Sequence, residues 1–116
     1  MEDTELYFYH AQLVRVIDGD TIVAMVDLGF DTHSKKTIRL YGIDAWESRT
    51  RDLNEKKKGV LATEFLQKTL DQTDGKFILE SKGVGKFGRC LGVIYVNERN
   101  VNDLLIQEQH ATPYDV

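Results

Sequence analysis

The apolar residues of this chain repeat with two different periods, and the change between them limits the folds it can adopt. Alternating, β-branched and aromatic residues predict strands at residues 6–17, 21–28 and 37–43. The turn Asp18-Gly19-Asp20 joins the first two strands, and a polar link at residues 31–36 precedes the third. From residue 53 to 71 the apolar residues instead recur at three and four, and Asp52 with Glu55 resembles a capping box. This segment is predicted to form one amphipathic helix.

The remaining chain predicts two more strands and a short helix. The strands lie near residues 76–81 and 89–96, joined by a glycine-bearing hairpin loop at 83–88. After a turn at 97–100, residues 102–111 suggest a second helix, which Pro113 would end. Three strands, a helix, two strands and a helix is the order of an OB-type barrel. We therefore predict a mainly β (α+β) fold, a five-stranded Greek-key barrel of OB type, forming a single domain over residues 1–116.

Composition narrows the class of protein. Of 116 residues, 41% are apolar and 29% charged, which is typical of a globular chain without disorder. The one cysteine, Cys90, cannot form an internal disulfide and reads more readily as a core thiol than as a nucleophile. The net charge of −4 argues against a generic nucleic-acid coat but allows a local basic cleft.

The N-terminal residues and the hydropathy of the chain predict where the protein resides in the cell. Residues 1–5 carry acids instead of a basic stretch before an apolar run, so we expect no signal peptide and a cytoplasmic protein. A phage-encoded protein or an excised domain would look the same. No run of eighteen apolar residues occurs, so no membrane-spanning helix is expected.

Polar side chains at three separated places form a set suited to phosphodiester hydrolysis. They are Asp18 and Asp20 in the first turn, Arg39, Asp44 and Glu47 around the end of the third strand, and Arg89 at the start of the fifth. Carboxylates from two loops supply oxygen ligands that Ca²⁺ accepts. Guanidinium groups stabilise charge that develops on a phosphoryl oxygen, and a carboxylate near a bound water can take its proton.

Each of these residues also has an ordinary structural explanation. Asp-Gly-Asp is a common tight turn, and on composition alone this explanation is the better one. Arg39 could belong to a surface ion pair, and Arg89 could cover the barrel with its aliphatic stem. A solvated carboxylate is the default for Glu47 in a polar loop.

Four ordered segments favour the functional explanation, because together they resemble the staphylococcal nuclease family. They are Val14 to Thr21, Ile38 to Glu47, Lys86 to Tyr95, and Val101 to Leu105. The resemblance extends from about Leu13 to Ala111. It implies direct Ca²⁺ ligation by Asp20, Asp44 and the backbone carbonyl of Ala45, with Asp18 and Glu47 around the metal through water. It further implies phosphate contacts from Arg39 and Arg89, a general base at Glu47, and substrate contacts from Lys86 and Phe87.

Several positions depart from the family pattern. Trp46 stands where the family commonly has proline before the catalytic Glu, which puts the placement of Glu47 in question. Phe87 stands where Tyr is frequent, and Gln109 where Gly is frequent. Gly85 stands where an acid is frequent, and the changes at Phe87 and Gly85 bear on substrate binding.

A basic segment follows the catalytic loop. Lysines are unfavourable at the start of a helix, so contact with a phosphate backbone would explain them, although a solvated helix face would serve equally. The segment comprises Arg49, Arg51, Lys56, Lys57 and Lys58. Tyr114, Tyr41 and Trp46 are candidates for stacking on bases, with barrel packing or plain exposure as the alternative.

The resemblance implies a Ca²⁺-dependent, thermonuclease-type hydrolase. It would cut DNA, with RNA left open, in endo- and exonucleolytic fashion and leave 3′-phosphate ends. We expect a monomer with nucleic acid as its substrate, no membrane and no obligate protein partner. The alternatives are a non-catalytic OB-fold module that binds nucleic acid or protein, and an inhibitor or assembly subunit on a retired nuclease fold. The complete set of catalytic side chains favours the enzyme, and Trp46 favours the binding module.

Overall fold

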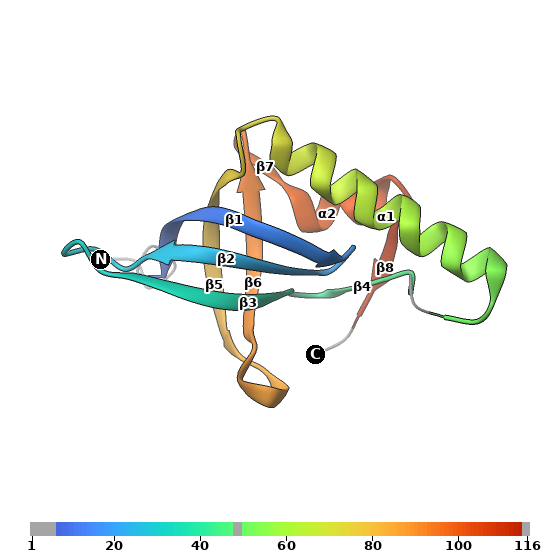
Figure 1. Ribbon diagram of the computed structural model, residues 1–116, viewed down its shortest axis with the longest axis horizontal. Helices are drawn as coiled ribbons and strands as arrows, with labels where there is room; N and C mark the ends of the chain where they lie inside the picture. The colour runs from blue at the N-terminus through green and yellow to red at the C-terminus, as the bar shows by residue number, and fades with distance from the viewer. Residues whose placement is uncertain (1–6, 48–49, 115–116) are drawn as a thin grey trace.

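A computed structural model of the chain describes residues 7–47 and 50–114, and its central feature is a closed barrel of five strands (Figure 1). The strands are β1 (Phe8–Asp18), β2 (Thr21–Asp27), β3 (His33–Leu40), β5 (Lys76–Val84) and β6 (Cys90–Val96). Antiparallel neighbours follow the order β3-β2-β1-β5-β6, and a parallel pairing of β3 with β6 closes the barrel. The predicted OB-type barrel is confirmed.

Alternate residues of the strands face the barrel interior, as their sequences predict, although Val23 on the other face of β2 is also buried. Ile22, Ala24 and Val26 of β2 face the interior together with Ile38 and Leu40 of β3, and all are buried. Helix α1 (Leu53–Asp71) has the predicted bounds, and Figure 1 shows it running across the barrel with its N-terminal half projecting beyond the strands. The Asp52 carboxylate caps it by accepting from the N–H groups of Asn54 at 3.0 Å and Glu55 at 3.2 Å.

The third strand differs from its predicted bounds at both ends. It begins at His33 because residues 33–36 pair with β2, from Asp27↔His33 to Ala24↔Lys36, along a part of the sheet where side chains meet solvent and no alternation is visible. It ends at Leu40, and a turn with Gly42 at φ 79° leads into β4 (Ile43–Ala45). The predicted polar link at 31–36 is therefore wrong over most of its length.

The C-terminal region also departs from the prediction. Helix α2 (Val101–Gln107) ends four residues before Ala111, and β8 (Ala111–Pro113) pairs with β4. Gln109 has φ 65°, a left-handed conformation that favours glycine and stops the helix. Pro113 thus lies in an edge strand and does not end the helix.

The shorter elements complete the fold. Strand β5 runs three residues past its predicted end, a 3₁₀ turn η2 (Lys86–Gly88) forms the hairpin loop, and β7 (Arg99–Asn100) pairs with β6. None of the helices in the described ranges is long and apolar enough to cross a membrane.

Candidate active site

Asp20 is the buried anchor of the site. The β1–β2 turn lies directly against α1, where a Cβ atom on Gly19 would come within 2.8 Å of the Ala62 Cβ. Oδ2 of Asp20 accepts a 2.9 Å hydrogen bond from the Ala45 N–H, and Oδ1 accepts one of 2.9 Å from the Thr21 hydroxyl. Its main-chain carbonyl accepts from the Leu40 N–H at 2.8 Å. One residue therefore ties the first turn to both β3 and β4.

Arg39 lies between two carboxylates. Its Nη1 donates to the carbonyls of Ile43 at 2.9 Å and Leu40 at 3.1 Å and lies 3.4 Å from Asp20 Oδ2. Its Nη2 donates to Asp44 Oδ1 at 3.3 Å. The Arg39 side chain is 16% exposed, whereas that of Asp44 is 57% exposed. The structure thus brings Asp20, Arg39 and Asp44 together, with the Asp44 side open to solvent.

Arg89 lies directly before β6, the strand that pairs with β3, the strand of Arg39. In the parallel ladder Ile38 pairs with Cys90, and both contact the core, so alternation turns Arg39 and Arg89 to the outer face. Strand geometry separates their Cα atoms by about 8 Å. Among the described residues, the buried Nε of Arg89 has no hydrogen-bond partner. A buried donor of this kind is costly unless something binds it, and a phosphate oxygen would do so.

The other predicted site residues are less tightly placed. Asp18 is half-buried at the end of β1, and Glu47 is exposed in the coil after β4. Lys86 and Phe87 are exposed on η2, where Phe87 has φ 62°. Tyr114 is 52% exposed beyond β8.

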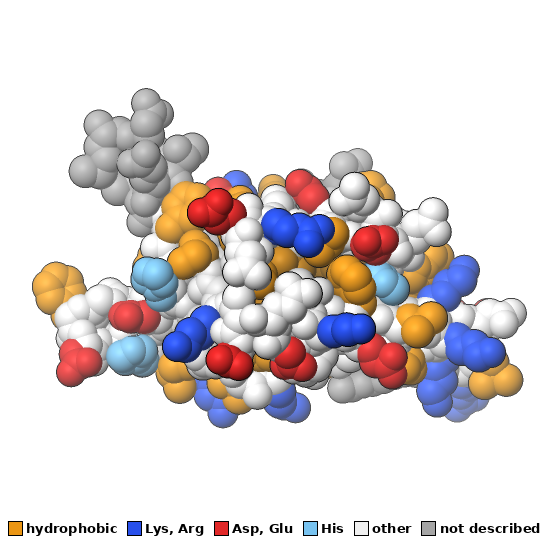
Figure 2. Space-filling view, turned by 90° about the horizontal axis from the view of Figure 1, so that it is seen from above, with side chains coloured by type: hydrophobic (Ala, Val, Ile, Leu, Met, Phe, Trp, Pro, Cys, Tyr) orange, Lys and Arg blue, Asp and Glu red, His pale blue; other side chains and the backbone are white. Residues whose placement is uncertain are grey.

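The basic segment spans the start of α1. Arg51, Lys56 and Lys57 are exposed, and Figure 2 shows Lys and Arg side chains gathered at the end of the molecule where this helix begins. Arg49 lies outside the described residues. The charges are placed to meet a polyanion, and among the described residues Arg51, Lys56 and Lys57 form no ion pair with the Asp20–Arg39–Asp44 cluster.

The donor set fits a hard divalent cation. The Asp20 and Asp44 carboxylates lie within 3.4 Å of the same guanidinium, on its two terminal nitrogens, and offer oxygen ligands. Within residues 7–47 and 50–114, no three acidic, histidine or cysteine side chains converge on one point. A complete coordination shell would therefore need the Ala45 carbonyl and water in addition to Asp20 and Asp44.

Asn102 and Trp46 make contacts near the site that the sequence did not predict. Asn102 is 2% exposed, and its amide donates to the carbonyls of Tyr41 at 2.9 Å and Gly92 at 3.1 Å while accepting from the Ile94 N–H at 3.2 Å. For Trp46, these contacts are made by the ring, whose centroid lies 4.5 Å from the Lys58 Nζ, and by the indole N–H, which donates to the Gln109 carbonyl. For Asn102, the available sequence signal was a polar residue between the apolar Val101 and the leucines of α2.

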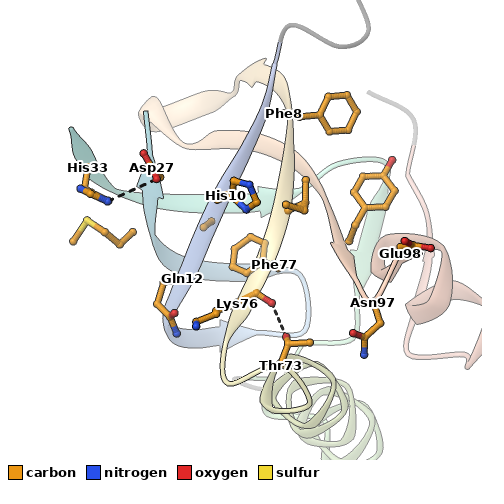
Figure 3. Close-up of a pocket in the computed structure, with 14 residues that line it drawn as sticks. Phe8, His10, Gln12, Asp27, His33, Thr73, Lys76, Phe77, Asn97 and Glu98 are labelled. Carbon is orange, nitrogen blue, oxygen red and sulfur yellow. Dashed lines mark hydrogen bonds and ion pairs between the residues drawn. The ribbon is translucent and has the colours of Figure 1, made fainter. Parts of the chain in front are cut away.

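A hollow of about 740 Å³ lies elsewhere on the surface, at the ends of the strands away from this cluster (Figure 3). Figure 3 shows Phe8, His10 and Phe77 around it, with His33 directed at Asp27; their Nε2 and Oδ2 atoms are 4.0 Å apart. Tyr95 also lines the hollow, and its hydroxyl donates to Glu80 Oε1 at 2.9 Å. The Tyr95 pKa is raised above its ordinary value, mainly by burial and secondly by this hydrogen bond. None of the described residues that line the hollow belongs to the candidate catalytic set.

Comparison with known proteins bears on this arrangement. Residues 37–116 match the family described as staphylococcal nuclease homologue. The chain is 31% identical over 110 residues to an uncharacterised endonuclease of Escherichia coli O157:H7, across 91% of this chain and 61% of that protein. It is 30% identical over 112 residues to protein ParB of Escherichia coli, across 89% and 56% of the two chains. An uncharacterised Bacillus anthracis protein is 32% identical over 104 residues, across 86% and 45%. The chain thus spans about half the length of these relatives.

Proposed function

The chain belongs to the staphylococcal nuclease family, and from this premise we propose that it is a Ca²⁺-dependent nuclease that hydrolyses DNA and leaves 3′-phosphate ends. The observation that supports the proposal most is the position of Arg39 between Asp20 and Asp44. The buried Nε of Arg89, without a hydrogen-bond partner among the described residues, adds a second donor on the same face of the barrel. Membership of a nuclease family implies a nucleic-acid substrate, and RNA is the second class to test.

The residues of this chain have separable tasks in such a reaction. Arg39 and Arg89 bind the phosphoryl oxygens and stabilise the charge that grows there in the transition state. Glu47 accepts a proton from the attacking water, whose oxygen forms a bond to phosphorus. The bond from phosphorus to the 5′ oxygen breaks, and that oxygen leaves as a hydroxyl after taking up a proton. Asp20, Asp44 and the Ala45 carbonyl would hold Ca²⁺, which supplies positive charge beside the phosphate.

Asp20 contributes to this arrangement even apart from metal binding. Its carboxylate fixes the Ala45 N–H and approaches Arg39, so it positions β4 and the guanidinium relative to one another. Both interactions join residues at least 19 positions apart in sequence, counted from 20 to 39. Replacing the carboxylate would therefore disturb the phosphate-binding group as well as the metal ligands.

The basic segment is proposed to bind the phosphate backbone beyond the cleaved bond. Its described members, Arg51, Lys56 and Lys57, are exposed at the end of the molecule that α1 extends. Arg49 is included in this proposal on sequence alone. Binding through such contacts weakens steeply with salt, because counterions are released.

A cleavage assay with matched variants tests the proposal. Purified protein is incubated with single-stranded DNA, duplex DNA and RNA in Ca²⁺, Mg²⁺ or EDTA, and the product ends are mapped. We expect Ca²⁺-dependent cleavage that EDTA abolishes and that Arg39→Ala lowers by about 10²-fold to 10³-fold. Arg99→Ala, which removes an exposed arginine on β7, is the control and should leave the rate unchanged.

Three outcomes would contradict the proposal in whole or in part. Intact substrates that nevertheless shift on a gel would identify a binding module instead. Cleavage that persists at full rate in EDTA would refute the metal requirement while retaining the hydrolase. Equal loss in the Arg39 and Arg99 variants would show that the cluster is not the site.

A further inference from the structure

Trp46 makes three contacts that join separate parts of the chain. Its main-chain N–H lies 3.4 Å from the His110 carbonyl, which continues the β4–β8 pairing by one residue. Its indole Nε1 donates to the Gln109 carbonyl at 3.2 Å. The Lys58 Nζ lies 4.5 Å from the centroid of the indole ring. The coil after β4 is thus connected to both α1 and the α2–β8 loop.

These contacts need the side chain and the conformation that this chain has. A proline at position 46 would stiffen the backbone but could not donate from its nitrogen or supply an indole N–H. The carbonyl that accepts the indole bond belongs to Gln109, whose left-handed φ of 65° turns the chain between α2 and β8. A cation over the face of an aromatic ring is attracted by its quadrupole, and indole is the best of the natural rings.

The position of Trp46 gives these contacts a consequence for the site. Ala45, one residue before it, donates to Asp20, and Glu47 is the residue after it. Glu47 itself is exposed, and its side chain forms no hydrogen bond or ion pair with the other described residues. The two residues that directly precede Glu47 are therefore both anchored, Ala45 by Asp20 and Trp46 by its own three contacts.

We propose that Trp46 is a positioning residue that holds Glu47 in place through its contacts with Gln109 and Lys58. This inference rests on the proposed function, since it assigns Trp46 a role in the step that Glu47 performs. In place of the backbone rigidity that a proline would give, Trp46 provides side-chain contacts to α1 and to the α2–β8 loop. Trp46 acts through Glu47 and does not touch the substrate.

The first experiment measures steady-state kinetics of Trp46→Phe and Trp46→Ala on DNA. Phenylalanine keeps a ring beside Lys58 but lacks the indole N–H, so kcat should fall about three-fold to ten-fold. Alanine loses both contacts, and a misplaced general base lowers kcat on the order of 10²-fold. KM should stay within about two-fold, because a base that acts in the transition state adds little to ground-state binding. Loss of kcat in proportion to the unfolded fraction alone would indicate a merely structural role.

A double-mutant cycle then separates positioning from general destabilisation. If Trp46 acts through Glu47, Trp46→Phe should change the residual single-turnover rate of Glu47→Gln by no more than about two-fold. If the two effects multiply, Trp46 does not act through Glu47 and the proposal is overturned. An unchanged kcat in Trp46→Phe would overturn it as well.

A spectroscopic measurement tests the contacts without relying on activity. The chain has one tryptophan, so a single indole N–H signal reports Trp46. Its exchange with solvent should be slowed in the folded protein, and Lys58→Gln should shift the signal, whereas Lys68→Gln in the last turn of α1 should not. Exchange at the rate of free indole would overturn the proposal. If the wild type cleaves nothing, the proposed function is overturned, and the role of Trp46 in it as well. If the wild type cleaves DNA and the Trp46 variants do so equally well, only the inference about Trp46 is overturned.

Discussion

Replacing Asn102 by alanine removes three hydrogen bonds from the interior between α2, β6 and the β3–β4 turn. The side-chain amide donates to the Tyr41 and Gly92 carbonyls and accepts from the Ile94 N–H. The Gly92 carbonyl keeps a second donor, because the Tyr41 N–H reaches it at 2.7 Å. The Ile94 N–H and the Tyr41 carbonyl lose the partner that Asn102 provides.

The cost can be estimated from these lost contacts. Leaving a buried backbone group without a partner costs about 1–3 kcal/mol, and Asn102 is only 2% exposed. For the two affected groups we expect the free energy of unfolding to fall by about 3 kcal/mol. That is a large part of the 5–15 kcal/mol typical of natural domains. The corresponding fall in Tm is roughly 10 °C for a domain of this size.

Urea unfolding of Asn102→Ala, followed by circular dichroism, measures this loss. Asn54→Ala is the matched control, since the Asn54 side chain is exposed and its backbone N–H to the Asp52 cap is retained. The control should change stability by no more than about 0.5 kcal/mol. A loss below about 1 kcal/mol in Asn102→Ala would refute the reasoning, because it would mean that water or a local shift replaces the lost partners.

Three further predictions concern other parts of the molecule. Gly19→Ala would bring a Cβ within 2.8 Å of the Ala62 Cβ, so the free energy of unfolding in urea should fall by about 1–3 kcal/mol. The Gly19→Ala/Ala62→Gly double variant should recover part of this loss. If it recovers none, the clash is elsewhere. Burial lowers the His110 pKa below 6.5, opposed in part by Glu108, so the unfolded state takes up the proton first and stability should fall as the pH drops through about 6.5. The fall should level off below the folded pKa, and His110→Gln, titrated in parallel, should show a shallower slope; an equal slope would assign the effect to other groups. Asp52→Ala removes the cap of α1 and should cost about 1 kcal/mol, and an unchanged midpoint of urea unfolding would show that the cap contributes nothing.

Local sequence signals were accurate where the determining contacts are local. Helix α1 has its predicted bounds because the Asp52 cap and the apolar repeat both act within a few residues. Strand β2 followed its alternation, since one face packs into the barrel. The start of β3 was missed because the side chains of residues 33–36 meet solvent on both faces, so pairing with β2 leaves no alternation to read.

Distant pairings were not accessible in this way. The strand β8 at Ala111–Pro113 exists because it pairs with β4, which lies 68 residues away at Asp44↔Thr112, counted from 44 to 112. The left-handed Gln109 ends α2 at a position where sequence propensity alone allowed the helix to continue. A proline has the same fixed φ and missing N–H whether it ends a helix or lies in an edge strand. Only the pairing of β8 with β4 therefore shows which of these two places Pro113 occupies.

The amino-acid sequence was enough to predict the barrel, the bounds of α1 and the acidic and basic side chains that the family resemblance singles out. These follow from short-range periodicity and from residue chemistry, which are properties of the chain before it folds. The folded chain alone shows that Arg39 lies within 3.4 Å of both Asp20 and Asp44, and that Trp46 contacts Gln109 and Lys58. Such contacts depend on how β3, β4, α1 and the α2–β8 loop meet in space, and the energy of each exists only when strands and helices distant in sequence are packed together.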